Sequence, residues 1–229
     1  MTFTEKTHAF IAAKYYVRLT EAFGDVGVGI FIHATQYYAG QRGRRMAQRA
    51  LRDGKELTYE TYMEYGEWVN TPEIIAAESA NQSVVEAISP DFVIRISRCP
   101  WHLQFKEMGL TEAGHEYCKH LDSAICRGFN PYLTYTVEKT LHKSDCCIHR
   151  ISDTNYASKP NVTKKKEYLH SFEYHCAHSY WAYNEVTAAV RGQRGEEVNA
   201  KVLADFAAEY GQEAADVLAG YRYVNFNVC

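Results

Sequence analysis

The chain has 229 residues, of which 46% are apolar and 23% are charged, and its formal net charge is -3 at neutral pH. This size and composition predict one globular domain over residues 1–229, and the weak negative charge gives no electrostatic case for a nucleic-acid partner. No apolar run approaches the roughly 20 residues of a membrane span, and the polar N-terminus lacks the apolar core of a signal peptide. We therefore expect a cytoplasmic protein with no membrane partner.

The N-terminal part, residues 1–70, is predicted to be helical. Apolar residues recur at helical spacing over residues 8–19, and Gly24 ends this segment. A second helix is expected over residues 26–52. A third is expected over residues 58–68, which begin with a threonine suited to an N-cap.

The middle part, residues 80–155, is predicted to contain a sheet built from two hairpins. A helix over residues 111–127 separates the hairpins, and Gly128 begins the break after it. Each hairpin has polar turn residues between two apolar runs. The four expected strands are residues 83–88, 92–97, 132–141 and 146–152.

The C-terminal part, residues 165–229, is predicted to form two or three helices, the longest over residues 172–191. The order of elements is therefore helices, hairpin, helix, hairpin, helices. It favours an α+β fold in which an antiparallel sheet is flanked by N-terminal and C-terminal helices. The long, aromatic-rich helices would also suit a homo-oligomer.

Five of the seven cysteines and five of the ten histidines lie between Cys99 and His149. In a reducing compartment we expect cysteines to be thiols, metal ligands or nucleophiles rather than disulfides. This stretch is therefore the first place to look for a functional site.

On the helix over residues 111–127, His115, Cys118 and Asp122 share one face. Cysteine, histidine and aspartate form a chemically sensible set for covalent catalysis, and a nearby histidine can lower the pKa of a thiol. The alternative is a small core cysteine beside two solvated residues.

On the last strand, alternation places Cys147 and His149 on one face and Cys146 on the other. Cys147 is the cysteine expected to join Cys118. A zinc ion held by Cys118, Cys147 and a histidine is an alternative, but no CxxC or HxxxH pair supports it. We expect no metal and no other cofactor.

Other candidates are substrate-binding residues. His102 follows a strand end, where ligand contacts are common, although the same stretch also fits a turn with a buried tryptophan. His175 and His178 share a helix face, where they would bind a metal, contact a substrate or simply pack against other helices.

In the basic segment of residues 40–45, Arg44 and Arg45 are candidate carboxylate anchors. Its two glycines, which cost a helix about 1 kcal/mol each, would let a ligand or a helix come close.

Three motifs lie along the middle of the chain: Glu116-Tyr117-Cys118 with Asp122, Phe129-Asn130-Pro131, and Asp145-Cys146-Cys147-Ile148-His149. Together they resemble the L-2-amino-thiazoline-4-carboxylic acid hydrolase family, over residues 25–155 and best over 110–150. The resemblance implies hydrolytic opening of a small heterocycle at an amidine-like or amide-like C–N bond, on a substrate that carries a carboxylate. Matched by position, it implies Cys118, Asp122, Asn130 and Cys147 as site residues.

The sequence thus predicts a hydrolase acting on a small acidic heterocycle. Cys118 would attack the ring carbon between the heteroatoms, Asp122 or His115 would move protons, and Arg44 or Arg45 would hold the acidic group. The alternative is a non-catalytic sensor for a small molecule or metal. It comes from a weaker similarity to the 4-vinyl-reductase-like domains, whose Gly-x-x-Cys-like strand end is replaced here by Lys143-Ser144-Asp145-Cys146.

Overall fold

The computed structural model describes residues 2–229, and these residues form nine α-helices and one four-stranded antiparallel sheet. The helices are α1 (Glu5–Phe23), α2 (Asp25–Arg52), α3 (Tyr59–Glu64), α4 (Pro72–Ala76), α5 (Pro100–Glu107), α6 (Thr111–Phe129), α7 (Phe172–Arg191), α8 (Gln193–Tyr210) and α9 (Gln212–Gly220). The strands are β1 (Gln82–Ala87), β2 (Phe92–Arg98), β3 (Tyr135–Lys139) and β4 (Cys147–Ile151). The predicted α+β fold, an antiparallel sheet with flanking helices, is confirmed.

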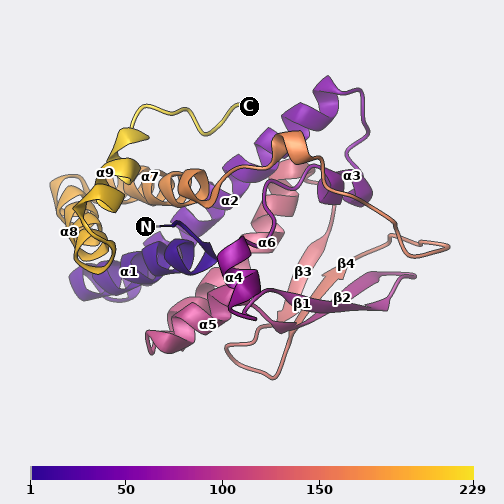
Figure 1. The fold of residues 1–229 in the computed structure, drawn as a ribbon, viewed down its shortest axis with the longest axis horizontal. Helices are drawn as coiled ribbons and strands as arrows, with labels where there is room; N and C mark the ends of the chain where they lie inside the picture. Colours follow the sequence, from indigo (N-terminus) through magenta and orange to yellow (C-terminus); the bar gives the residue numbers. More distant parts are fainter. Residues whose placement is uncertain (1) are drawn as a thin grey trace.

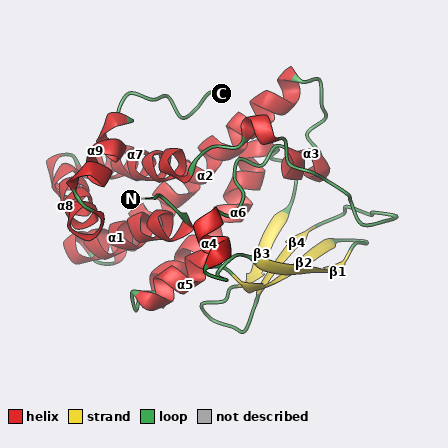
Figure 2. Cartoon of the chain, viewed as in Figure 1, coloured by secondary structure: helices red, strands yellow, loops and turns green. Residues whose placement is uncertain are grey.

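The sheet joins two hairpins through their second strands, in the order β1-β2-β4-β3. In the central pair, Ile94 of β2 lies opposite His149 of β4. Figure 1 shows the sheet at one end of the molecule and helices α7, α8 and α9 at the other, while Figure 2 shows the same division by secondary structure. Helix α6 packs along α2 and also contacts β3, so it connects the helical part with the sheet.

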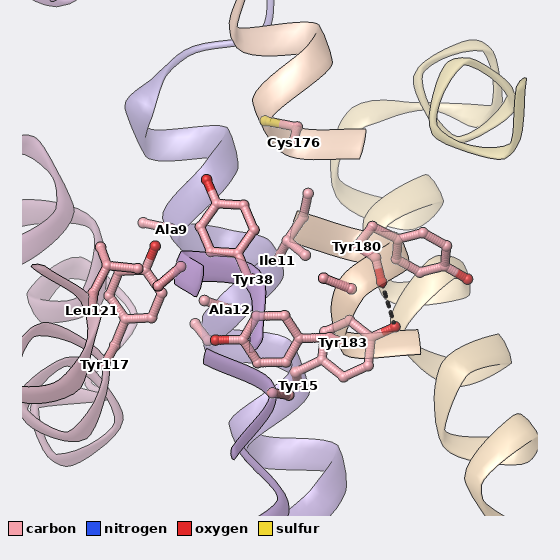
Figure 3. Packing of buried hydrophobic residues seen from close by; sticks show 14 of the residues in the cluster. Ala9, Ile11, Ala12, Tyr15, Tyr38, Tyr117, Leu121, Cys176, Tyr180 and Tyr183 are labelled. Carbon is pink, nitrogen blue, oxygen red and sulfur yellow. Dashed lines mark hydrogen bonds between the residues drawn. The ribbon is translucent and has the colours of Figure 1, made fainter. Parts of the chain in front are cut away.

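The helical part has an aromatic core in which the buried hydroxyl groups are hydrogen-bonded. Tyr15, Tyr38 and Tyr183 are fully buried. The Tyr15 hydroxyl donates to the Tyr180 carbonyl over 3.2 Å, as Figure 3 shows, and the Tyr38 hydroxyl lies 3.0 Å from Nε2 of His8. These tyrosines therefore serve helix packing, because a buried hydroxyl needs a partner to offset its loss of water.

The backbones of α2 and α6 approach closely at glycines. A Cβ atom on Gly43 would overlap the Ile125 carbonyl, and one on Gly128 would lie 2.6 Å from the Gly40 carbonyl oxygen. The glycines of residues 40–45 thus admit a neighbouring helix rather than a ligand. Helix α6 accordingly continues through Gly128 to Phe129, beyond its predicted end.

We expect Gly43→Ala to lower the free energy of unfolding by about 1–3 kcal/mol, because the added methyl group forces the two helices apart. Gly29 lies on the same helix, and a Cβ atom added to it would have no other atom within 4 Å. Gly29→Ala is the matched control and should raise stability by up to about 1 kcal/mol through better helix propensity. Urea unfolding measures both; equal effects of the two variants would contradict the packing argument.

Two local predictions differ from the structure. The third helix ends at Glu64, earlier than predicted. The chain after it has no regular secondary structure, and its Glu67 pairs with buried Arg45. The stretch from Cys99 to His102 begins helix α5, with Cys99 at the N-cap and Pro100 in the first turn, where proline needs no donor. Within residues 2–229, none of the helices is both long enough and apolar enough to span a bilayer.

Candidate functional site

A cavity of about 430 Å³ lies where α2, α3 and α6 meet the inner face of the first hairpin. A loop that follows β4 forms its remaining wall. The side chains that matter for its chemistry are Arg42 from α2, Tyr62 from α3, Trp68, Phe92 from β2, Asp122 from α6 and Lys164 from the loop. The cavity thus brings aromatic rings together with charges of both signs.

Asp122 supplies the carboxylate of this cavity and is the only acidic side chain among the described residues that line it. None of the hydrogen bonds and ion pairs formed within residues 2–229 involves this carboxylate; those of α6 near it belong to Cys118, Glu116 and Ser123. It lies near enough to Tyr62 to raise the pKa of that phenol, although burial is the larger cause. Its oxygens are therefore free to accept a proton or a hydrogen bond from a bound molecule.

Arg42 supplies a buried cation to the same cavity. Its Cζ atom lies 5.9 Å from the centre of the Tyr38 ring. Its Nε atom lies 3.6 Å from a carboxylate oxygen of Glu67. The residue is only 6% exposed, and its buried Nε has no hydrogen-bond partner within residues 2–229. A buried guanidinium with spare donors is suited to an acidic ligand.

Behind Arg42, a single carboxylate serves three arginines of α2. Glu67 pairs with Arg45 at 2.7 Å and Arg49 at 2.8 Å, besides the longer contact with Arg42. Burial raises the pKa of Glu67, but the three guanidinium groups outweigh it and hold that pKa below its ordinary value. The cluster keeps a positive excess, which makes this side of the cavity attractive to anions.

Lys164 adds a second cation from the loop. Its Nζ donates to the Trp68 carbonyl over 2.6 Å and lies 5.1 Å from the centre of the Trp68 ring. Burial, and then the charge of Arg42, lower the pKa of Lys164 to about 8. Lys159 lines the cavity from the exposed end of the same loop.

Cys118 lies on α6 one turn before Asp122, but it does not line the cavity. Its Sγ is 3.5 Å from Nε2 of His142. Burial, and then Cys99, Cys147 and Asp122, raise the pKa of the Cys118 thiol well above its ordinary value, while burial lowers the pKa of His142 to about 3. Both groups are therefore neutral near pH 7, and no thiolate–imidazolium pair forms.

The histidine beside Cys118 is thus His142 and not His115, which is bonded at 2.8 Å to the Thr140 hydroxyl. His142 also lies 3.3 Å from His102, so the two rings share one cluster with the thiol. His142 belongs to the turn between β3 and β4. Helical or strand spacing gives no relation between such a turn residue and α6, so the sequence offered no signal for the pair.

Cys147 shares one face of β4 with His149, as alternation predicted. Cys147 and His149 are both buried and flank the half-buried Ile148. The Cys147 thiol accepts from the Leu141 amide over 3.2 Å. It lies near Cys118, since a charge on it would raise the pKa of that thiol. Cys146 lies instead beside Arg95.

The predicted anchors lie outside the cavity. Arg45 is fully buried in the pair with Glu67 and donates to the Phe226 carbonyl, so its donors are used within the fold. Arg44 is exposed and bonds Asn227. His175 is buried with Nε2 3.1 Å from the Glu67 carbonyl oxygen. Their neighbour Arg42 is the arginine of this segment that reaches the cavity.

Asn130 also has a role in the fold. It caps the end of α6 and donates to the Leu57 carbonyl over 2.8 Å, which ties that end to the chain before α3. Within residues 2–229, no group of three or more histidine, cysteine, aspartate or glutamate side chains has the arrangement of a metal site.

Comparisons with curated proteins and with solved structures find no match. A family model matches residues 4–151, about two thirds of the chain, and carries the description L-2-amino-thiazoline-4-carboxylic acid hydrolase. The matched part includes Arg42, Cys118, Asp122 and Cys147, while Lys164 lies beyond it. The chain therefore belongs to the L-2-amino-thiazoline-4-carboxylic acid hydrolase family.

Proposed function

We propose that this protein is a hydrolase that opens a small nitrogen heterocycle bearing an acidic group, at an amidine-like or cyclic amide C–N bond. The observation that carries the proposal is the unpaired carboxylate of Asp122, which shares one cavity with the buried cation Arg42. A proton acceptor and an anion anchor in one aromatic-lined cavity suit a planar, acidic, hydrolysable ring.

In the proposed reaction Arg42 binds the acidic group of the substrate, and the ring lies among Tyr62, Trp68 and Phe92. Asp122 takes a proton from a water molecule whose oxygen forms a bond to the ring carbon between the heteroatoms. Asp122 passes this proton to the ring nitrogen, so that the C=N bond of an amidine becomes a single bond. The remaining C–N bond then breaks as the new hydroxyl group becomes a carbonyl, and the hydroxyl proton passes through Asp122 to the leaving nitrogen. Proton transfer by a positioned side chain contributes about 10²–10⁴ to a rate.

The direct test is turnover of L-2-amino-thiazoline-4-carboxylic acid and of a panel of cyclic amidines and cyclic amides with and without a carboxylate. Loss of the ring chromophore and mass spectrometry of the opened product measure the reaction. We expect turnover of acidic rings and little turnover of their uncharged amides. Stoichiometric binding of these rings without any turnover would support the sensor function instead.

Cys118 distinguishes activated water from a covalent thiol mechanism. We expect Cys118→Ser to keep kcat within about threefold of the wild type, because the neutral thiol does not line the cavity and an alcohol replaces it with little change of volume. Cys176→Ser is the control, because it removes the thiol of a fully buried cysteine outside the cavity. A drop of 10³ or more in kcat at unchanged stability, seen only for Cys118, would establish the covalent route.

A further inference from the structure

The cavity carries more positive charge than a substrate with one carboxylate would balance. Arg42, Lys159 and Lys164 line it against one carboxylate, that of Asp122. The groups behind Arg42 do not offset this excess, since Glu67 is already shared among three arginines. Partly buried charge without a counter-charge is unfavourable, and a bound anion relieves it.

The cations have donors to spare. None of the hydrogen bonds formed within residues 2–229 uses the guanidinium of Arg42; its buried Nε faces Glu67 at 3.6 Å, which leaves the two terminal nitrogens for a ligand. The ammonium of Lys164 gives one hydrogen bond to the Trp68 carbonyl, which leaves two of its three donors for a ligand. These donors come from different walls of the cavity, α2 and the loop after β4, and together they offer more positive charge than one acidic group neutralises.

Both loop lysines follow the matched part of the chain. The family model ends at Ile151, before Lys159 and Lys164, and its description names a substrate with a single carboxylic acid group. Arg42 lies within the matched part and can bind that group, so the two lysines are the cations for which such a substrate supplies no second acidic group.

We propose that the cavity takes heterocycles with two acidic groups, the first bound by Arg42 and the second by Lys159 and Lys164. This inference rests on the proposed function, because it names the class of ring that the same cavity accepts. Lys164, half-buried and held by Trp68, gives the second subsite a fixed position, while the exposed Lys159 closes it from the rim.

The test compares the binding of thiazole-4-carboxylate with that of thiazole-2,4-dicarboxylate and thiazole-4,5-dicarboxylate by isothermal titration calorimetry. These aromatic rings resist hydrolysis, so binding is measured without turnover. We expect at least one dicarboxylate to bind about 10- to 100-fold more tightly than the monocarboxylate, as two further charge-assisted hydrogen bonds allow.

Lys164→Gln should remove most of this preference, because the affinity for the dicarboxylate should fall much further than the affinity for the monocarboxylate. Lys159→Gln, at an exposed position where folding is not at risk, should remove part of it. Lys166→Gln changes an exposed lysine nearby that does not line the cavity, and it is the matched control.

Equal affinities for the monocarboxylate and both dicarboxylates would overturn the inference, and so would a preference that survives both lysine variants. Neither result bears on turnover of L-2-amino-thiazoline-4-carboxylic acid, on which the proposed function depends. A lysine-dependent preference for a dicarboxylate, found in a protein that hydrolyses no ring, would support this second subsite and contradict the hydrolase.

Discussion

Replacement of Asp122 with asparagine is expected to lower kcat for ring opening by about 10²–10⁴, since the amide keeps the shape of the side chain but accepts no proton. KM should change little, because the acidic group of the substrate is held by Arg42 and not by Asp122. The free energy of unfolding should also stay the same, since the carboxylate has no partner within residues 2–229 to lose.

Asp145→Asn is the control for the loss of one negative charge. Asp145 is exposed and its nearest cation, Arg95, lies at 3.5 Å on the surface. This variant should keep wild-type kcat, because surface ion pairs contribute little. Wild-type turnover in the Asp122 variant would refute Asp122 as the proton acceptor. It would favour the Cys118–His142 cluster as the catalytic site instead.

Replacement of Glu67 with glutamine is expected to have the largest effect on stability, lowering the free energy of unfolding by about 3–5 kcal/mol. The reason is that Arg42, Arg45 and Arg49 would lose their common counter-charge in the protein interior. Equilibrium unfolding in urea at neutral pH measures this loss. Glu64→Gln, a nearby acid without an ion pair within the described residues 2–229, is the control and should change stability by less than about 0.5 kcal/mol.

The same cluster sets a pH dependence. Because the folded-state pKa of Glu67 is lowered, its stabilising contribution is present above the unfolded carboxyl value of about 4.3 and is lost as the pH falls through the folded value. The wild type should therefore lose stability on acidification more steeply than the Glu67→Gln variant. Parallel pH profiles for the two proteins would show that Glu67 is not the counter-charge.

Local patterns predicted much of this molecule correctly because their causes lie within short stretches of chain. The helix expected over residues 172–191 is α7, which begins and ends where expected. Helix geometry placed Cys118 and Asp122 on one face of α6, and strand alternation placed Cys147 and His149 on one face of β4. Each of these results depends only on the 3.6-residue and 2-residue periods of the backbone.

The sequence placed the candidate anchors at Arg44 and Arg45, whereas the arginine of residues 40–45 that lines the cavity is Arg42. Arg42, Arg45 and Arg49 recur at positions i, i+3 and i+7, a spacing that places them on one buried face of α2. Arg44 lies off that face and is exposed. This spacing predicts that the three arginines lie on one buried helix face. It does not indicate which of them lines the cavity and which are paired with Glu67.

By itself the sequence determined the fold class, the family and the faces of single elements, since these follow from backbone periods, caps and matched motifs. Only the tertiary structure decided that Asp122 shares a cavity with Arg42 and Lys164, that His142 lies beside Cys118, and that Gly43 admits a helix. These relations join residues far apart along the chain. They depend on how α2, α6 and the sheet pack, which no local period specifies.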